Sequence, residues 1–348
     1  ALRWFREFHI DALRLDAVHA LVDHTAVHIL EELAVETLQL SVHLRRPLTL
    51  IAESDLNDPK LISARAAGGY GLHAQWDDDV HHAVHTAVSG ERQGYYGDFG
   101  SLSCLAHTLR HGFFHDGSYS SFRGRRHGRP VDVRRIPASS LLAYTCTHDQ
   151  VGNRAIGDRP GSYLTPGQLA LKAAIVLTSP YTPMLFMGEE WGASSPFQFF
   201  TSHPEPELAV ATAEGRRAEF AQHGWATDDV PDPQDPETFL RSKLNWAEIG
   251  EEPHARLLDC YRQLLRLRRE RSEITDPWLS ELGVEYDEAQ RWLVIRRGPL
   301  QVACNLGDEA VVVPVGGTPI LWWDSPTPDE TGAATVVPGH SFVVLEVR

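Results

Sequence analysis

The chain has 348 residues, of which 42% are hydrophobic and 23% are charged, and its formal net charge is −15. A chain of this length and composition can bury a sizeable core and fold as one large domain plus a smaller one. The negative charge argues against nucleic acid or an anionic membrane as a partner and favours a neutral or cationic ligand.

The cysteines are scattered and form no CxxC pair, which predicts neither a zinc site nor a disulfide framework. We expect reduced thiols in a cytoplasmic protein. No apolar run has the length of a membrane span, and residues 1–10 have the pattern of an amphipathic helix rather than of a signal peptide. From this start we expect the chain to begin within a fold.

Short apolar runs then alternate with helical patterns, which is typical of βα units. Polar or acidic residues stand at the carboxyl end of each run. The predicted strands span residues 10–16, 47–53, 72–77, 141–149 and 182–190.

Two helices are marked by their sequence. At the first, Thr165 has the place of an N-cap, Pro166 is the first helical residue, and Gln168 completes a capping box. The second spans 254–270, where apolar residues recur on one stripe. That stripe consists of Leu257, Leu258, Tyr261, Leu264 and Leu265.

From about residue 279 the pattern changes to short strands separated by turn dipeptides, which predicts a small all-β domain. Its predicted strands span 291–297, 300–306, 310–315 and 340–347.

We therefore predict an α/β fold, the C-terminal part of a (β/α)8 TIM barrel, because polar residues gather where barrel active sites are built. Residues 1–279 would form the catalytic barrel domain, with barrel strands 4 to 8, and residues 280–348 a β-sandwich domain. Five strands are too few to close a barrel. We expect the first strands before Ala1, in an N-terminal part of the same enzyme that completes the barrel, since an open barrel leaves strand edges unpaired.

Asp16, Glu53 and Asp149 each end or follow a different predicted strand, so they can share one pocket at the barrel axis. Glycoside hydrolysis needs such a set: one carboxylate as nucleophile and one carboxylic acid to protonate the leaving oxygen. Arg14 points to the same side of the strand as Asp16 and would hold it ionised and oriented. A lone strand-end aspartate is more often a helix cap, but three acids, with Arg14 and His148 beside two of them, favour the catalytic interpretation.

The segments LRLDAVHAL, LIAESDLNDP and YTCTHDQVGNR resemble three conserved segments of the alpha-amylase family, in the expected order. The resemblance implies Asp16 as nucleophile, Glu53 as acid/base and Asp149 as transition-state stabiliser, with Arg14 and His148 in support. The family's first conserved segment, its first three barrel strands and its N-terminal β domain have no counterpart in this chain.

Four further segments resemble the trehalose-releasing members of that family. This resemblance implies a retaining hydrolase that cuts the α-1,4 bond next to the trehalose end of maltooligosyltrehalose, a step of trehalose biosynthesis. The segments are AQWDDDVHHAVH, GYYGDFG, SSFRGRRHG and SPYTPMLFMGEEWGASSPFQFFTSH.

Several side chains near strand ends are candidates for substrate contacts. The aromatic rings could stack on sugars or pack in the core, and the acids could bind trehalose hydroxyls or lie in solvated loops. The aromatic candidates are Trp76, Tyr95, Tyr96 and Trp191, and the acidic ones are Asp78, Asp79 and Glu190. The basic run at 122–135 is interpreted as a loop folded over the barrel mouth.

Two histidine groups, one at His24 and His28 and one at His81, His82 and His85, have helical spacing but lack the glutamate of HExxH, so we predict no metal site. No organic cofactor is implied, because two carboxylates suffice for the chemistry. Two alternatives stay open: another alpha-amylase-family enzyme, such as a glycogen-branching or debranching enzyme, and a non-catalytic glucan-binding protein.

Overall fold

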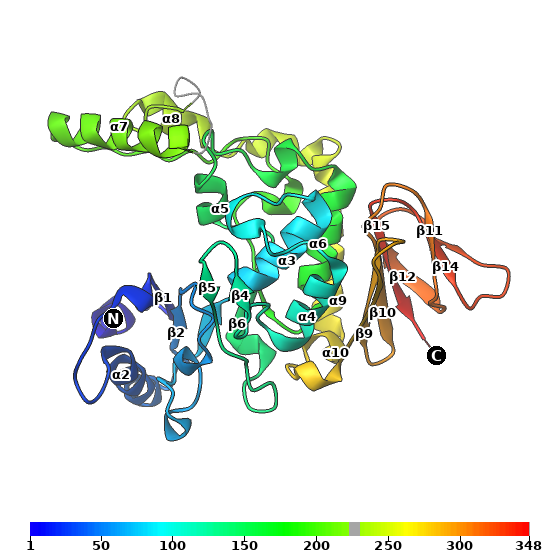
Figure 1. Ribbon diagram of the computed structural model, residues 1–348, viewed down its shortest axis with the longest axis horizontal. Coiled ribbons are helices and arrows are strands. Elements are labelled where there is room, and N and C mark those ends of the chain that lie inside the picture. The colour runs from blue at the N-terminus through cyan, green and yellow to red at the C-terminus, as the bar shows by residue number, and fades with distance from the viewer. Residues whose placement is uncertain (223–229, 348) are drawn as a thin grey trace.

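Five short strands form one parallel sheet in the computed structural model, which describes residues 1–222 and 230–347 (Figure 1). The sheet order follows the chain, as successive βα units require. The strands, in that order, are β1 (Ala12–Leu15), β2 (Thr49–Ala52), β3 (Ala74–Trp76), β6 (Leu141–Tyr144) and β7 (Thr182–Met184).

Side chains alternate between the two faces of this sheet. Leu50 and Ala52 of β2, with Leu141 of β6, pack with the helices in the main hydrophobic core. Residues between them point to the other face and form a smaller apolar cluster. That cluster contains Ala74, Trp76, Leu142 and Tyr144, with Ile51 and Met184 packed against it. Both faces of the sheet are therefore covered, as is usual for parallel strands.

Helices follow the strands and cover the outer face of the sheet. The capping box predicted at Thr165 and Gln168 is present, and so is the buried stripe of the helix that starts at His254. The helices of this part are α1 (Leu2–Glu7), α2 (Ile29–Leu44), α3 (Asp78–Ser89), α4 (Leu102–His111), α5 (His148–Gly152), α6 (Pro166–Thr178), α7 (Pro206–Gln222), α8 (Pro236–Arg241), α9 (His254–Glu270) and α10 (Ser272–Thr275). In Figure 1, α7 and α8 extend away from the sheet in an excursion between β7 and α9.

The C-terminal residues form two antiparallel sheets with a shared apolar cluster between them, in which Val294 and Val343 of one sheet meet Val313 and Val337 of the other. The first sheet contains β12 (Thr318–Trp322), β15 (Ser341–Glu346), β10 (Leu300–Asn305), β9 (Trp292–Arg297) and β8 (Leu282–Asp287), in that order. The second contains β11 (Val311–Val313), β14 (Thr335–Val337) and β13 (Thr327–Pro328).

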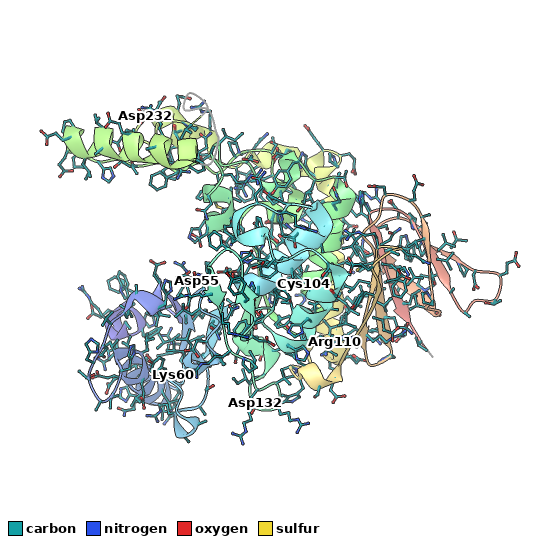
Figure 2. The ribbon with its side chains drawn as sticks, in the orientation of Figure 1. Asp55, Lys60, Cys104, Arg110, Asp132 and Asp232 are labelled. Atoms are coloured by element: carbon teal, nitrogen blue, oxygen red, sulfur yellow. The ribbon has the colours of Figure 1, made fainter. Side chains whose placement is uncertain are left out.

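Arg110 of α4 connects the two parts of the molecule. It lies on the side of α4 that faces the C-terminal sheets (Figure 2), and its guanidinium donates to the main-chain oxygen of Val284 in β8.

The strands of the parallel sheet, with β9, β10, β11 and β15, lie inside the predicted ranges but are shorter. The sequence predicted none of β4 (Tyr119–Ser120), β5 (Arg125–Arg126), β8, β12, β13 and β14. The prediction of a strand through residue 149 is wrong, because α5 begins at His148, where Thr147 and Gln150 form a capping box. The prediction of a strand through residue 190 is also wrong. Gly188 has φ +87°, and residues 189–191 form a 3-10 turn. Among the described residues, no helix is long and apolar enough to cross a membrane.

Candidate active site at the strand ends

Arg14 is the centre of a charged cluster at the carboxyl ends of the parallel strands. Its Nη1 donates to Asp16 Oδ1 at 2.6 Å, and its Nη2 lies 3.7 Å from Glu53 Oε2. The same Nη2 lies 4.0 Å from Asp149 Oδ2. The structure thus brings the predicted acids around one guanidinium, although they come from three segments far apart in the sequence.

The turn after β1 fixes Asp16 relative to Glu53. Ala17 adopts a left-handed conformation with φ 43°, and its main-chain N–H donates to Glu53 Oε2 at 2.6 Å. The N–H of Val18 donates to the main-chain oxygen of Glu53 at 3.1 Å. A residue with a Cβ rarely adopts a positive φ, so these two hydrogen bonds hold the turn in place.

The acids differ in exposure. The side chain of Asp16 is 77% exposed, that of Asp149 45%, and that of Glu53 only 18%. Asp16 and Asp149 are therefore open to a ligand, while Glu53 is enclosed beside Arg14 and the Ala17 N–H.

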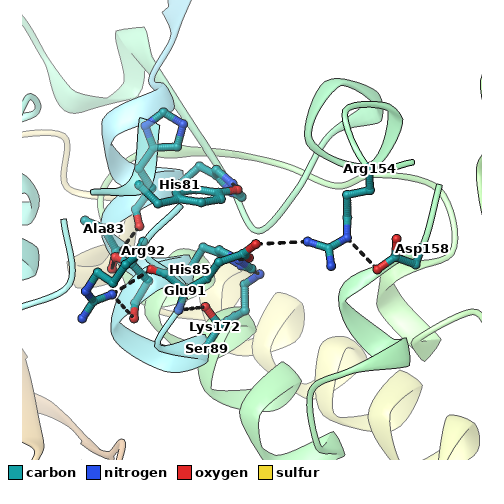
Figure 3. Close-up of polar contacts among 12 residues, drawn as sticks. His81, Ala83, His85, Ser89, Glu91, Arg92, Arg154, Asp158 and Lys172 are labelled. Atoms are coloured by element: carbon teal, nitrogen blue, oxygen red, sulfur yellow. Dashed lines mark hydrogen bonds and ion pairs between the residues drawn. The ribbon is translucent and has the colours of Figure 1, made fainter. Parts of the chain in front are cut away.

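Asp149 lies in the first turn of α5, and the Nε2 of the neighbouring His148 is 3.3 Å from Asp149 Oδ1. Arg154, just beyond the end of α5, anchors this short helix through a charged network (Figure 3). Arg154 Nη1 contacts Glu91 Oε1 at 3.2 Å, and Arg154 Nε donates to Asp158 Oδ2 at 2.6 Å.

The same network continues into the interior. Glu91 Oε2 lies 2.8 Å from the Nε2 of His85 on α3, and His85 Nδ1 lies 3.1 Å from Lys172 Nζ on α6. These contacts connect the segment that carries Asp149 to α3 and α6, two helices that pack against the sheet.

Asp78 lies next to the site at the start of α3, where its Oδ1 accepts a hydrogen bond from the Tyr144 hydroxyl. Burial raises the pKa of Asp78 to about 7, and the negative charges of Asp79, Glu53 and Asp55 act in the same direction. Asp78 is therefore partly protonated near neutral pH.

Asp79 has a different environment from the one predicted. It is 5% exposed, and its Oδ2 accepts from Asn57 Nδ2 at 2.8 Å and from the main-chain N–H groups of Phe114 and His115 at 2.9 and 2.8 Å. These bonds satisfy a buried carboxylate and anchor a loop, so Asp79 has a structural role, and its contact with substrate stays a prediction.

A pocket of about 320 Å³ lies beside the acids, with Asp55, Asp78 and Tyr95 in its wall. One side is the hairpin of β4 (Tyr119–Ser120) and β5 (Arg125–Arg126), which belongs to the predicted basic loop. Arg123 Nη2 holds this hairpin to Asp55 Oδ2 at 2.7 Å. Asp55 was not predicted as a site residue, although it stands two positions after Glu53 in a segment that carried the resemblance.

Three of the aromatic side chains predicted to contact sugar are buried. Trp76 and Tyr96 are each 7% exposed and Trp191 is 2% exposed, so packing accounts for most of the surface of each ring, and their contact with sugar stays a prediction. Trp191 Nε1 instead donates to Glu248 Oε1 at 2.9 Å. Tyr95 is half-buried, lines the pocket and remains a candidate.

Glu190, predicted to contact trehalose, is half-buried, and its Oε2 is enclosed without a hydrogen-bond partner. The neighbouring Glu189 forms the more elaborate contacts. Its Oε2 accepts from the Phe186 N–H at 2.9 Å, and its Oε1 accepts from the Tyr261 hydroxyl at 3.1 Å. Burial raises the pKa of Glu189 to about 7, partly offset by these hydrogen bonds.

This shift predicts a pH dependence of stability. The folded state keeps a proton on Glu189 between about pH 4.5 and 7 that the unfolded state has released, so the free energy of unfolding falls as the pH rises through that range. In Glu189→Gln, the amide oxygen can accept from Phe186 and the amide nitrogen can donate to Tyr261. We expect the free energy of unfolding of this variant to fall by about 2 kcal/mol less than that of wild type over this pH range. This figure allows for the partial exposure of the Glu189 side chain.

Urea unfolding at pH 5 and pH 8 measures the effect. The matched control is Glu251→Gln, because Glu251 is exposed. An equal fall in stability between the two pH values for wild type and Glu189→Gln would contradict the assignment.

No group of histidine, cysteine and acidic side chains within residues 1–222 and 230–347 could hold a metal ion. His24 lies outside any helix and His28 caps α2, so these two do not share a helical face as predicted. Burial lowers the pKa of His82 to about 3 and that of His85 to about 4, so both rings are neutral. The four cysteines are buried and free.

Comparison with known proteins shows which proteins this chain is similar to. The chain is 66% identical over 345 residues to the malto-oligosyltrehalose trehalohydrolase of Mycobacterium tuberculosis, covering 99% of this chain and 59% of that protein. A protein of Salmonella typhimurium described as an alpha amylase has a crystal structure that matches with a TM-score of 0.85 and 34% identity, covering 100% of this chain and 59% of that one. The chain is thus similar to a curated malto-oligosyltrehalose trehalohydrolase and to a solved protein described as an alpha amylase.

More distant relatives show the same likeness. The malto-oligosyltrehalose trehalohydrolase of Saccharolobus solfataricus is 36% identical over 94% of this chain and 54% of its own length. The alpha-amylase of H. orenii, at 17% identity and a TM-score of 0.60 over 100% of this chain and 63% of that one, shows the likeness in fold alone. A family model described as "Domain of unknown function (DUF3459)" matches residues 277–344, the C-terminal sheets. The chain spans about 59% of the length of the first curated relative.

Proposed function

We propose that this chain provides the catalytic residues of a malto-oligosyltrehalose trehalohydrolase. The full-length enzyme would hydrolyse the α-1,4 bond beside the trehalose end of maltooligosyltrehalose and release trehalose. The observation that carries the proposal is the contact of one guanidinium, Arg14, with the acids at positions 16, 53 and 149. The 66% identity to a curated trehalohydrolase supports the substrate.

In the proposed mechanism, the exposed Asp16 carboxylate attacks the anomeric carbon, and the hydrogen bond from Arg14 orients it. Glu53 protonates the leaving oxygen and later activates water, and Asp149 stabilises the positive charge that develops on the sugar. For a retaining reaction the nucleophile and acid lie ~5 Å apart, and their shared contact with one guanidinium agrees with a short separation.

We propose that His148, Asp78, Tyr95 and Glu190 contact the substrate. His148 lies beside Asp149, and Tyr95 and Asp78 line the same pocket. A partly protonated Asp78 can both donate to and accept from sugar hydroxyls.

We further propose that residues 1–279 belong to a closed (β/α)8 barrel whose other strands come from an N-terminal part of the same enzyme. Among the described strands, β1 and β7 each pair with a single neighbour. Apolar side chains beside β1 are exposed, including Trp4 at 51%, Val22 at 78% and Val42 at 71%. We also propose that residues 280–348 form a β-sandwich domain. The free cysteines favour a cytoplasmic location, which we propose for the enzyme.

Product analysis tests the function. The full-length enzyme is incubated with maltooligosyltrehalose and, separately, with plain maltooligosaccharide of matched length. We expect trehalose from the first and little cleavage of the second. Comparable cleavage of both, or transfer to new branches, would favour another alpha-amylase-family enzyme, and the absence of turnover would favour a glucan-binding protein.

Arg14→Lys tests the central contact. A lysine ammonium cannot bridge three carboxylates in one plane as a guanidinium does, so we expect kcat to fall by about 10²-fold or more while the enzyme stays folded. The matched control is Arg46→Lys, because Arg46 also pairs with an aspartate, Asp11 at 2.7 Å, but lies away from the acids. Near-wild-type turnover by Arg14→Lys would contradict the proposed role.

A further inference from the structure

Trp76, at the end of β3, packs against the guanidinium of Arg14. The Arg14 Cζ lies over the Trp76 ring, 4.3 Å from its centre, which is a cation–π contact. The ring is not a hydrogen-bond acceptor for the two Nη groups, which contact the carboxylates. The cation–π contact and the ion pairs therefore do not compete.

The indole is itself held firmly. It is 7% exposed, and the ring of Tyr144 meets it edge-on at 5.7 Å between centroids. The Tyr144 hydroxyl is bound to Asp78. The ring of His148 also meets Trp76 edge-on, at 6.0 Å. One buried indole thus contacts both Arg14 and His148.

We infer that Trp76 is a positioning residue for the proposed hydrolysis, acting through Arg14 and His148 rather than by stacking on the substrate. Arg14 has three acidic neighbours, at 2.6, 3.7 and 4.0 Å, and could tilt toward any of them. A buried ring against the guanidinium restricts that motion and keeps all three carboxylates within contact distance. The inference rests on the proposed function.

Kinetics of Trp76→Phe and Trp76→Leu in the full-length enzyme test the inference. A buried cation–π contact is strong enough that its loss lowers kcat by about 3- to 30-fold in Trp76→Leu, with KM little changed. Trp76→Phe keeps a ring face and should recover most of kcat. In an Arg14→Lys background, Trp76→Leu should lower kcat by a smaller factor than in wild type, because the Arg14 contact of the ring is already changed and only the His148 contact remains to be lost. If Trp76→Leu does not fold, Trp76→Met, which is longer and more flexible, replaces it.

Trp323 provides a matched control in the C-terminal domain. It is 8% exposed and carries Arg256, whose Cζ lies 3.8 Å from its ring centre. Trp323→Leu removes the same kind of contact, so it should lower Tm without lowering kcat.

The inference is overturned if Trp76→Leu lowers only Tm, if Phe fails to rescue kcat, or if the loss is unchanged in the Arg14→Lys background. Wild-type product analysis separates these results from a failure of the proposed function. If the wild-type enzyme prefers plain maltooligosaccharide, the substrate proposal is wrong, and the same kinetic comparison is made on that sugar.

Discussion

Asp16→Asn should release trehalose from maltooligosyltrehalose about 10⁴-fold more slowly than the wild-type enzyme, or slower still. An amide oxygen is too weak a nucleophile to form the glycosyl-enzyme ester that a retaining hydrolase needs. Because the Asp16 side chain is 77% exposed, the change should leave the fold intact. Trehalose release measures turnover, and calorimetric titration with intact substrate should show binding within severalfold of wild type.

Asp11→Asn is the control for Asp16→Asn. Asp11 stands just before the same strand, its side chain is 73% exposed, and it too forms an arginine pair at 2.7 Å, but with Arg46. Its turnover should match wild type. If Asp16→Asn hydrolysed substrate within tenfold of wild type, Asp16 would not be the nucleophile and the retaining mechanism would have to be abandoned.

Glu53→Gln should lower kcat by about 10²- to 10⁴-fold, the usual contribution of a general acid. The Gln amide oxygen can still accept from the Ala17 N–H, which donates to Glu53 Oε2 at 2.6 Å, so the turn beside Asp16 should persist. The fall in kcat would therefore reflect the loss of proton transfer by Glu53 and not a displacement of Asp16.

A substrate whose leaving group needs no protonation distinguishes the two acids. With a maltooligosyl fluoride, formation of the covalent intermediate should be nearly as fast in Glu53→Gln as in wild type, whereas Asp16→Asn should remain inactive. The matched control is Glu36→Gln on α2, because Glu36 is exposed and takes no part in the contacts of the acids. Equal losses by Glu53→Gln on the fluoride and on maltooligosyltrehalose would show that Glu53 is not the acid.

The strand order and the positions of Asp16 and Glu53 were predictable, because buried parallel strands are apolar runs and their carboxyl ends meet at one edge. Asp149 was predicted at a strand end but lies in a helix. The signal for that helix was local: Thr147 and Gln150 have capping-box spacing. The edge strand β12 was missed because Pro319 interrupts its pattern, and proline is tolerated at a sheet edge.

The sequence by itself determined which residues can do chemistry: local spacing sets the strand ends, and residue type sets charge and hydrogen-bonding capacity. Only the tertiary structure decided which partners those residues have. The sequence around Trp76 does not distinguish a ring that stacks on sugar from one that packs against Arg14. The sequence around Asp79 likewise does not distinguish a ligand contact from a bond that anchors a loop. Such contacts join segments dozens of residues apart, and burial depends on everything that packs around them, so no local pattern contains them.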